Sequence, residues 1–174
     1  MPRLYRDDAQ RIIHLDGGEQ AQFVFTNSKL PSLHLYKESA DGTPLGGVTY
    51  RLAKIEDGSR YLDRTTSSTG EICWEGLEPG VYSLIETSTV SDHLLDTTEY
   101  HVELFPGQDS TVVLQNDKRP NLTVVKRDAD SGEPVADTVF LVEAADGHSV
   151  DEIKTGPDGT AVLENLLPGV YEIS

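Results

Sequence analysis

Three short segments alternate apolar and polar residues with the period of a β-strand, and each ends with a polar residue on its apolar face. The segments are residues 33–37, 82–86 and 112–116. Because side chains two positions apart in a strand lie on the same face, we expect Lys37, Glu86 and Asn116 to point into the core. A buried charge costs several kcal/mol unless it is paired or neutralised. These three side chains are therefore expected to meet one another or to leave the core.

If the three side chains meet, a covalent reaction becomes possible. A dry interior favours a neutral amine and a protonated carboxyl group, so the amine of Lys37 can attack the side-chain amide of Asn116. Glu86 would polarise that amide and move a proton to the departing ammonia. Each residue also has an ordinary alternative, in which Lys37 reaches solvent, Glu86 is exposed and Asn116 begins a turn.

The chain repeats itself at a spacing of 89 residues. The sequence around Pro79 recurs around Pro168, an offset of 168 − 79 = 89, and such a period indicates tandem structural repeats. The same offset relates Asn27 to Asn116, Pro31 to Pro120, Leu33 to Leu122, Lys37 to Lys126 and Gly70 to Gly159, while Tyr50 and Phe140 lie 90 apart. We expect residues 29–118 to form a complete repeat, residues 119–174 the first part of another, and residues 1–28 the closing strands of a preceding one.

Secondary structure is predicted to be β throughout. Strand-like runs are expected at residues 33–37, 48–53, 71–75, 81–86, 99–104 and 111–115, with turns rich in Gly, Pro, Asp and Ser between them. Only residues 91–95 could form a helical turn. Six or seven short strands in about 90 residues favour an antiparallel sandwich. The predicted fold class is all-β, with tandem antiparallel β-sandwich modules.

Charge excludes several partners. Thirty acidic residues against fourteen basic ones give a formal charge of −16, which repels nucleic acid and anionic membrane surfaces. The sequence contains no apolar run long enough to span a bilayer. We therefore expect no nucleic-acid partner and no membrane partner.

No cofactor or metal site is expected. Residues 128–132 resemble part of a calcium loop, but the glycine is one position early and the twelfth position is Val139, so a solvated turn is favoured. The five histidines lack ligand spacing and most are expected to be exposed, and no catalytic triad signature is present. Cys73 is alone and is expected to pack in a strand. Tyr82 is expected in the core, while the position of Trp74 stays open.

Several motifs, in this order, resemble the collagen-adhesin B-type (prealbumin-like) domains of Gram-positive surface proteins and pilins. The motifs are residues 35–37 with residues 41–48, residues 76–87, and a final strand that ends at Asn116. The resemblance covers the middle repeat, the C-terminal repeat as far as Tyr171 and the N-terminal stretch from about Arg11. It implies prealbumin-like β-sandwiches of the inverse immunoglobulin type, which build stalks and pilus shafts.

The resemblance also implies residue roles. In that family a first-strand lysine joins a last-strand asparagine through an isopeptide bond, with a glutamate as catalyst. Lys37, Asn116 and Glu86 match these positions one for one. Lys126 and Asn27 match cross-link partners of the partial repeats, but the glutamate belonging to Lys126 would fall at position 175. Only the middle repeat is expected to be complete for this chemistry.

The resulting hypothesis is a structural stalk or spacer module of a Gram-positive cell-surface adhesin or pilus-like protein. We expect one autocatalytic bond per molecule and no enzymatic turnover. The expected location is extracellular and anchored to the cell wall, with the chain an excerpt that lacks a signal peptide and sorting motif. Expected partners are adjacent repeats, a host protein or glycan reached through other domains, and further copies that exchange strands through the partial repeats at each end.

Two alternatives stay open. The modules could themselves bind a host protein or glycan without a cross-link, which a contiguous patch of exposed aromatic residues would favour. They could also be transthyretin-like or carboxypeptidase-accessory sandwiches, which an exposed Glu86 and an unchanged mass would favour.

Overall fold

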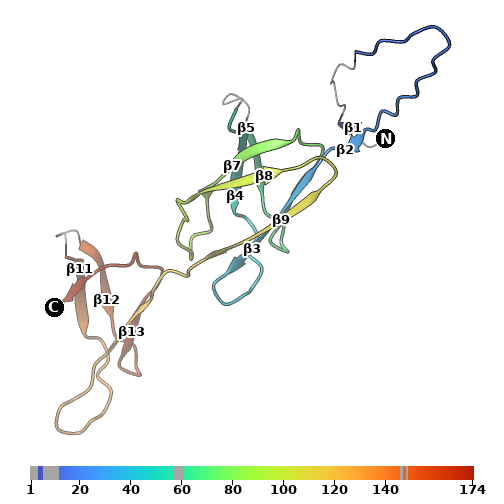
Figure 1. Cartoon of the computed structure of the whole chain (residues 1–174). Helices are drawn as coiled ribbons and strands as arrows, with labels where there is room; N and C mark the ends of the chain where they lie inside the picture. Colours follow the sequence, from blue (N-terminus) through green and yellow to red (C-terminus); the bar gives the residue numbers. More distant parts are fainter. Residues whose placement is uncertain (1–3, 6–11, 57–60, 146, 148) are drawn as a thin grey trace. The chain divides into compact units, whose positions relative to one another are not determined.

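The computed structural model describes residues 4–5 and 12–174, apart from residues 57–60, 146 and 148 (Figure 1). The described residues form strands and turns, and none of them belongs to a helix capable of crossing a membrane. The predicted all-β class is confirmed. The chain divides into two compact units: unit 1 comprises Met1–Thr89 and Leu95–Gln115, and unit 2 comprises Val90–Leu94 and Asn116–Ser174.

Two sheets form the body of the complete repeat, residues 29–118. One has the order β6-β3-β9 and the other the order β5-β4-β7-β8 (Figure 1). The strands of the first sheet are β3 (Ser32–Ser39), β6 (Glu71–Trp74) and β9 (Asp109–Asn116). Those of the second are β4 (Thr49–Lys54), β5 (Tyr61–Thr65), β7 (Gly80–Ser88) and β8 (Glu99–Leu104).

Both sheets bury their alternating apolar residues in one shared core. Leu33 and Leu35 of β3 belong to the same buried cluster as Leu52 of β4 and Leu84 of β7, and each is 0% exposed. Side chains from two sheets that meet in one core define a β-sandwich. The antiparallel β-sandwich predicted from the strand pattern is confirmed for this repeat.

The sandwich of unit 1 includes a strand, β5, that the alternation did not predict. Strand β5 pairs with β4 at the edge of its sheet, and four of its five residues are exposed. An edge strand that buries so little needs no apolar alternation, so its sequence carries little signal. Residues 91–95, predicted as a possible helical turn, contain a hydrogen-bonded turn in which the His93 amide donates to the carbonyl of Val90.

Unit 2 has the same strand arrangement as the first five strands of the complete repeat. Its sheets have the orders β10-β13 and β12-β11-β14. The strands are β10 (Leu122–Val125), β11 (Val139–Ala144), β12 (Ser149–Lys154), β13 (Thr160–Leu163) and β14 (Tyr171–Ile173). A small buried cluster of Val142, Ile153 and Ala161 forms its core. By sequence, these strands correspond to β3, β4, β5, β6 and β7 of unit 1.

The N-terminal stretch takes a different form. Strands β1 (Leu4–Tyr5) and β2 (Ser28–Lys29) pair with each other. Residues 12–27, whose sequence matches that of β8 and β9, contain no strand and are exposed. Their apolar side chains are among the most exposed in the described chain, with Ile12 94%, Val24 77% and Phe25 72% exposed.

Candidate functional site

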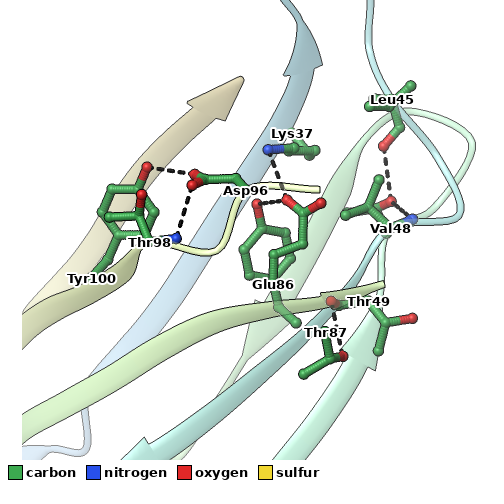
Figure 2. Close-up of polar contacts among 11 residues, drawn as sticks. Lys37, Leu45, Val48, Thr49, Glu86, Thr87, Asp96, Thr98 and Tyr100 are labelled. Atoms are coloured by element: carbon green, nitrogen blue, oxygen red, sulfur yellow. Dashed lines mark hydrogen bonds and ion pairs between the residues drawn. The ribbon is translucent and has the colours of Figure 1, made fainter. Parts of the chain in front are cut away.

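A charged pair lies inside the core of unit 1. Lys37 on β3 is 0% exposed and Glu86 on β7 is 3% exposed, and Lys37 Nζ lies 3.1 Å from Glu86 Oε2 (Figure 2). The two strands belong to different sheets, so the pair spans the interior of the sandwich. The predicted burial of both residues is confirmed, and their ordinary solvent-exposed alternative is wrong.

The backbone around Lys37 is held from both sides. Its amide donates to the carbonyl of Gly70 at 2.7 Å, and its own carbonyl accepts from the amide of Leu45 at 2.8 Å. Gly70 has φ +75°, and a Cβ atom at this position would collide with the carbonyl oxygen of Lys37. Only glycine fits here. The lysine therefore enters the core from a fixed point of the backbone.

Tyr50 belongs to this site, and sequence reasoning missed it. It faces Glu86 across the β4–β7 pairing, next to a register shift between Thr49 and Tyr50. Its hydroxyl donates to Glu86 Oε2 at 2.8 Å, and Lys37 Nζ lies 5.6 Å from its ring centroid. The available signal was its strand phase, which places a polar hydroxyl between the core positions Val48 and Leu52.

The environment of Tyr50 keeps its hydroxyl protonated. Burial raises the pKa of Tyr50 far above its ordinary value, and the negative charge of Glu86 and the hydrogen bond to it act in the same direction. The hydroxyl is therefore protonated at neutral pH and available as a hydrogen-bond donor.

A second acid, Asp96, lies on the loop before β8 (Figure 2). Its carboxylate accepts from the amide of Thr98 at 2.9 Å and from the hydroxyl of Tyr100 at 2.6 Å. Burial acts to raise the pKa of Asp96, but these hydrogen bonds outweigh it and hold the pKa below its ordinary value. The positive charge of Lys37 also lowers the pKa of Asp96. Lys37 therefore interacts electrostatically with two acids, Glu86 and Asp96.

Asn116 is the last residue of β9, which is the neighbour of β3 in the three-stranded sheet. It is 3% exposed, and Leu114 two positions earlier lies in the buried core of unit 1. The predicted burial of Asn116 is therefore confirmed as well. The lysine-bearing and asparagine-bearing strands lie side by side.

The two residues predicted as cross-link partners in the partial repeats lie in other surroundings. Asn27 is exposed in the stretch that contains no strand, and Lys126 is exposed just after β10. Within the chain that the structure describes, neither has the buried position of its counterpart in the complete repeat.

Other candidates take structural positions. Trp74 is 1% exposed and Tyr82 is 4% exposed, and both belong to the core of unit 1. The Tyr82 hydroxyl donates to the carbonyl of Glu78 at 2.8 Å. Cys73 is half-buried on β6. The prediction that Tyr82 packs in the core is confirmed, and Trp74 joins it there.

The calcium-like segment forms a self-contained turn. The Asp128 carboxylate accepts hydrogen bonds from the amide of Asp130 and from the amide and hydroxyl of Ser131. Among the residues that the structure describes, no group of three or more His, Cys, Asp and Glu side chains could hold a metal ion. His93, unlike the exposed His14 and His101, is buried.

Comparisons with known proteins agree with this architecture. The family model for the SpaA prealbumin-like fold domain matches residues 31–118 and 120–174. The Bacillus anthracis TIE protein is 20% identical with a TM-score of 0.50, over 82% of this chain and 30% of that chain. A streptococcal ancillary pilin is also 20% identical with a TM-score of 0.50, over 98% of this chain and 64% of that chain.

The chain therefore spans less than two thirds of the length of either solved protein. No curated protein sequence matches it. The two segments matched by the family model are the two repeats that share the 89-residue spacing, and together they make up most of the chain. The chain belongs to the SpaA prealbumin-like fold domain family.

Proposed function

We propose that this chain is a structural stalk or spacer segment of a Gram-positive surface adhesin or pilus-like protein, locked by an isopeptide bond between Lys37 and Asn116. The observation that carries the proposal is the completely buried Lys37–Glu86 pair at 3.1 Å. A buried ion pair is seldom a gain in stability over apolar packing, so its presence in the core favours a chemical role. The burial of Asn116 on the strand next to the lysine-bearing strand supports the same role.

The reaction balances without any external reagent. Glu86 takes a proton from the Lys37 ammonium group, and the neutral amine attacks the side-chain carbonyl carbon of Asn116. A C–N bond forms, and the attacking nitrogen gives up a second proton as the bond to the original nitrogen breaks. That nitrogen receives both this proton and the one held by Glu86, so it departs as an ammonium ion. The product is a neutral amide, and Glu86 returns to its starting state. Since the bond forms once per molecule, the protein is not an enzyme in the sense of turnover.

The bond would stabilise the fold and transmit tension. Positions 37 and 116 lie 79 positions apart in the sequence (116 − 37), and closing a loop of this length stabilises a fold by roughly 4–5 kcal/mol in the chain-entropy model. The bond would join the first and last strands of the main sandwich, so a pulling force could cross unit 1 without unfolding it. This property suits an extracellular, cell-wall-anchored spacer that presents other, host-binding domains.

We also propose that copies of this chain associate through strand edges. In unit 1, β9 adjoins β3 and β8 adjoins β7. The counterparts of β3 and β7 in unit 2 are β10 and β14, and each is an edge strand in the described sheets. Residues 12–27 of another copy carry the sequence pattern of β8 and β9, and exposed strand edges accept such segments by strand addition.

Intact-mass measurement tests the cross-link. The protein is expected to be lighter than its sequence mass by one ammonia, and Lys37→Ala or Glu86→Ala should each restore the full sequence mass. Lys126→Ala is the matched control, because it removes the corresponding lysine of the other repeat and should leave the mass loss unchanged. A wild-type protein with the full sequence mass would contradict the proposal.

A further inference from the structure

We propose that Tyr50 is a positioning residue for the cross-linking reaction: its hydroxyl fixes the orientation of the Glu86 carboxyl group that passes the proton. The inference rests on the proposed Lys37–Asn116 bond and adds a residue to its machinery. The role is positioning because the hydroxyl contacts the acid, while the bond itself forms between two other side chains.

The geometry at Glu86 carries the inference. One carboxylate oxygen, Oε2, receives the Tyr50 hydroxyl at 2.8 Å and lies 3.1 Å from Lys37 Nζ. A carboxyl group held at one oxygen by two donors cannot rotate about its terminal bond without breaking both contacts. The second oxygen is thereby given a fixed direction as well. The lysine contact must change when the proton leaves the amine, whereas the Tyr50 hydroxyl can keep its hydrogen bond to Oε2 during that step.

Tyr50 is itself held rigidly. It is 0% exposed within the core of unit 1, and it lies on a central strand paired with both β5 and β7. The register shift beside it brings Tyr50 opposite Glu86. Because the hydroxyl stays protonated, it can act as a fixed donor and does not compete with Glu86 for the lysine proton.

The second repeat provides an internal comparison. Phe140 on β11 corresponds to Tyr50 on β4, and it packs half-buried against the core of unit 2. A ring without a hydroxyl therefore fits this strand position. In the same repeat the counterpart lysine, Lys126, is exposed. The hydroxyl thus occurs in the repeat with the buried acid–amine pair and is missing from the repeat in which the lysine is outside the core.

The experiment compares two tyrosines of the same core. The loss of ammonia is followed by intact mass during cell-free synthesis of the full chain, with folding followed in parallel. Tyr50→Phe is expected to slow bond formation roughly tenfold to a hundredfold, the effect of losing one hydrogen bond to a charged, oriented group. Tyr82→Phe removes a buried hydroxyl of equal size that donates to a backbone carbonyl at 2.8 Å, and it should leave the rate within about twofold of wild type.

A matched pair of unnatural residues separates positioning from packing. At position 50, 4-aminophenylalanine restores a donor at the tip of the ring, and 4-methylphenylalanine fills the same space without one. The amino variant should recover most of the rate and the methyl variant should not. Equal rates for this pair, or a wild-type rate for Tyr50→Phe, would overturn the role of Tyr50 while leaving the cross-link intact. A wild-type chain that never loses ammonia would instead overturn the proposed function itself.

Discussion

The two repeats hold their first-strand lysines by the same backbone contacts and place the side chains in opposite environments. The amide of Lys37 donates to the carbonyl of Gly70 at 2.7 Å, and the amide of Lys126 donates to the carbonyl of Gly159 at 2.8 Å. Both glycines have a φ near +75°, and a Cβ atom on either would collide with the lysine carbonyl. Yet the Lys37 side chain is 0% exposed and Lys126 is exposed.

The difference lies in the strands that surround each lysine. In unit 1, β3 has β9 as a second neighbour, and the nine-residue strand β7 extends far enough to supply Glu86. In unit 2, β10 pairs with β13, and β14 pairs with β11. A local motif therefore fixes where a lysine leaves the strand, and the opposing strands decide whether it is buried beside an acid.

The largest expected contrast between the repeats comes from removing each lysine. Lys37→Ala removes one member of a buried ion pair, which costs about 3–5 kcal/mol, and it also prevents the proposed cross-link. Lys126→Ala removes an exposed side chain and should change the free energy of unfolding by less than about 0.5 kcal/mol. Chemical denaturation can follow unit 1 through the fluorescence of Trp74, the one tryptophan of the chain, and unit 2 through amide signals of β11. Equal effects of the two substitutions would contradict the view that the two lysines lie in different environments.

The next contrast concerns the apolar residues two positions before each lysine. Leu35 is 0% exposed, and Leu35→Ala should destabilise unit 1 by about 2–5 kcal/mol because it leaves a cavity in a closed core. Val124 is half-buried, and Val124→Ala should destabilise unit 2 by about 1 kcal/mol or less. The same denaturation measurements apply. A Val124 effect as large as that of Leu35 would mean that unit 2 has a core as closed as that of unit 1.

A smaller contrast is expected in the acid range. Hydrogen bonds hold the pKa of Asp96 below its ordinary value, so its stabilising contribution is present above the unfolded-state pKa and is lost as pH falls through the lower folded-state pKa. Hydrogen bonds from Thr160 lower the pKa of Asp158 in unit 2 in the same way. Asp96→Asn should weaken the loss of unfolding free energy at acidic pH in unit 1 alone, and Asp158→Asn should do so in unit 2 alone. The measurement is the free energy of unfolding of each unit as a function of pH.

If the unfolding free energy of unit 1 kept the same dependence on acidic pH in Asp96→Asn, another carboxyl group would have to be responsible for that dependence. The effect should be modest for both residues because each carboxylate is partly or fully solvated, and solvent screens such interactions.

Much of the fold followed from the sequence because the alternation and the 89-residue spacing are strong local signals. Lys37 and Glu86 could be placed in the core by strand phase alone, since a two-residue period leaves each side chain one choice of face. The same reasoning placed Asn116 inward. The repeat also predicted that Gly70 and Gly159 would take equivalent positions.

The contacts across the sandwich could not be predicted in the same way. Tyr50 was recognisable as a core position, but its hydrogen bond to Glu86 depends on a register shift between β4 and β7, which the sequence does not mark. The exposure of Lys126 likewise depends on which strands cover it. Such features arise from tertiary neighbours, whereas strand phase is a property of each segment alone.

The weakest expected effect is association of the chain with itself. Phe25 is 72% exposed, while Leu114, its counterpart at the 89-residue offset, is 8% exposed within β9. If residues 12–27 add to the open edges of unit 2, sedimentation velocity on the 174-residue chain should show oligomers that increase with concentration, and Phe25→Ser should weaken them. Phe105→Ser is the control, because Phe105 is an exposed aromatic residue, 47% exposed, that follows β8. A chain that stays monomeric at high concentration would show that the likeness between residues 12–27 and the closing strands of unit 1 does not extend to pairing between copies.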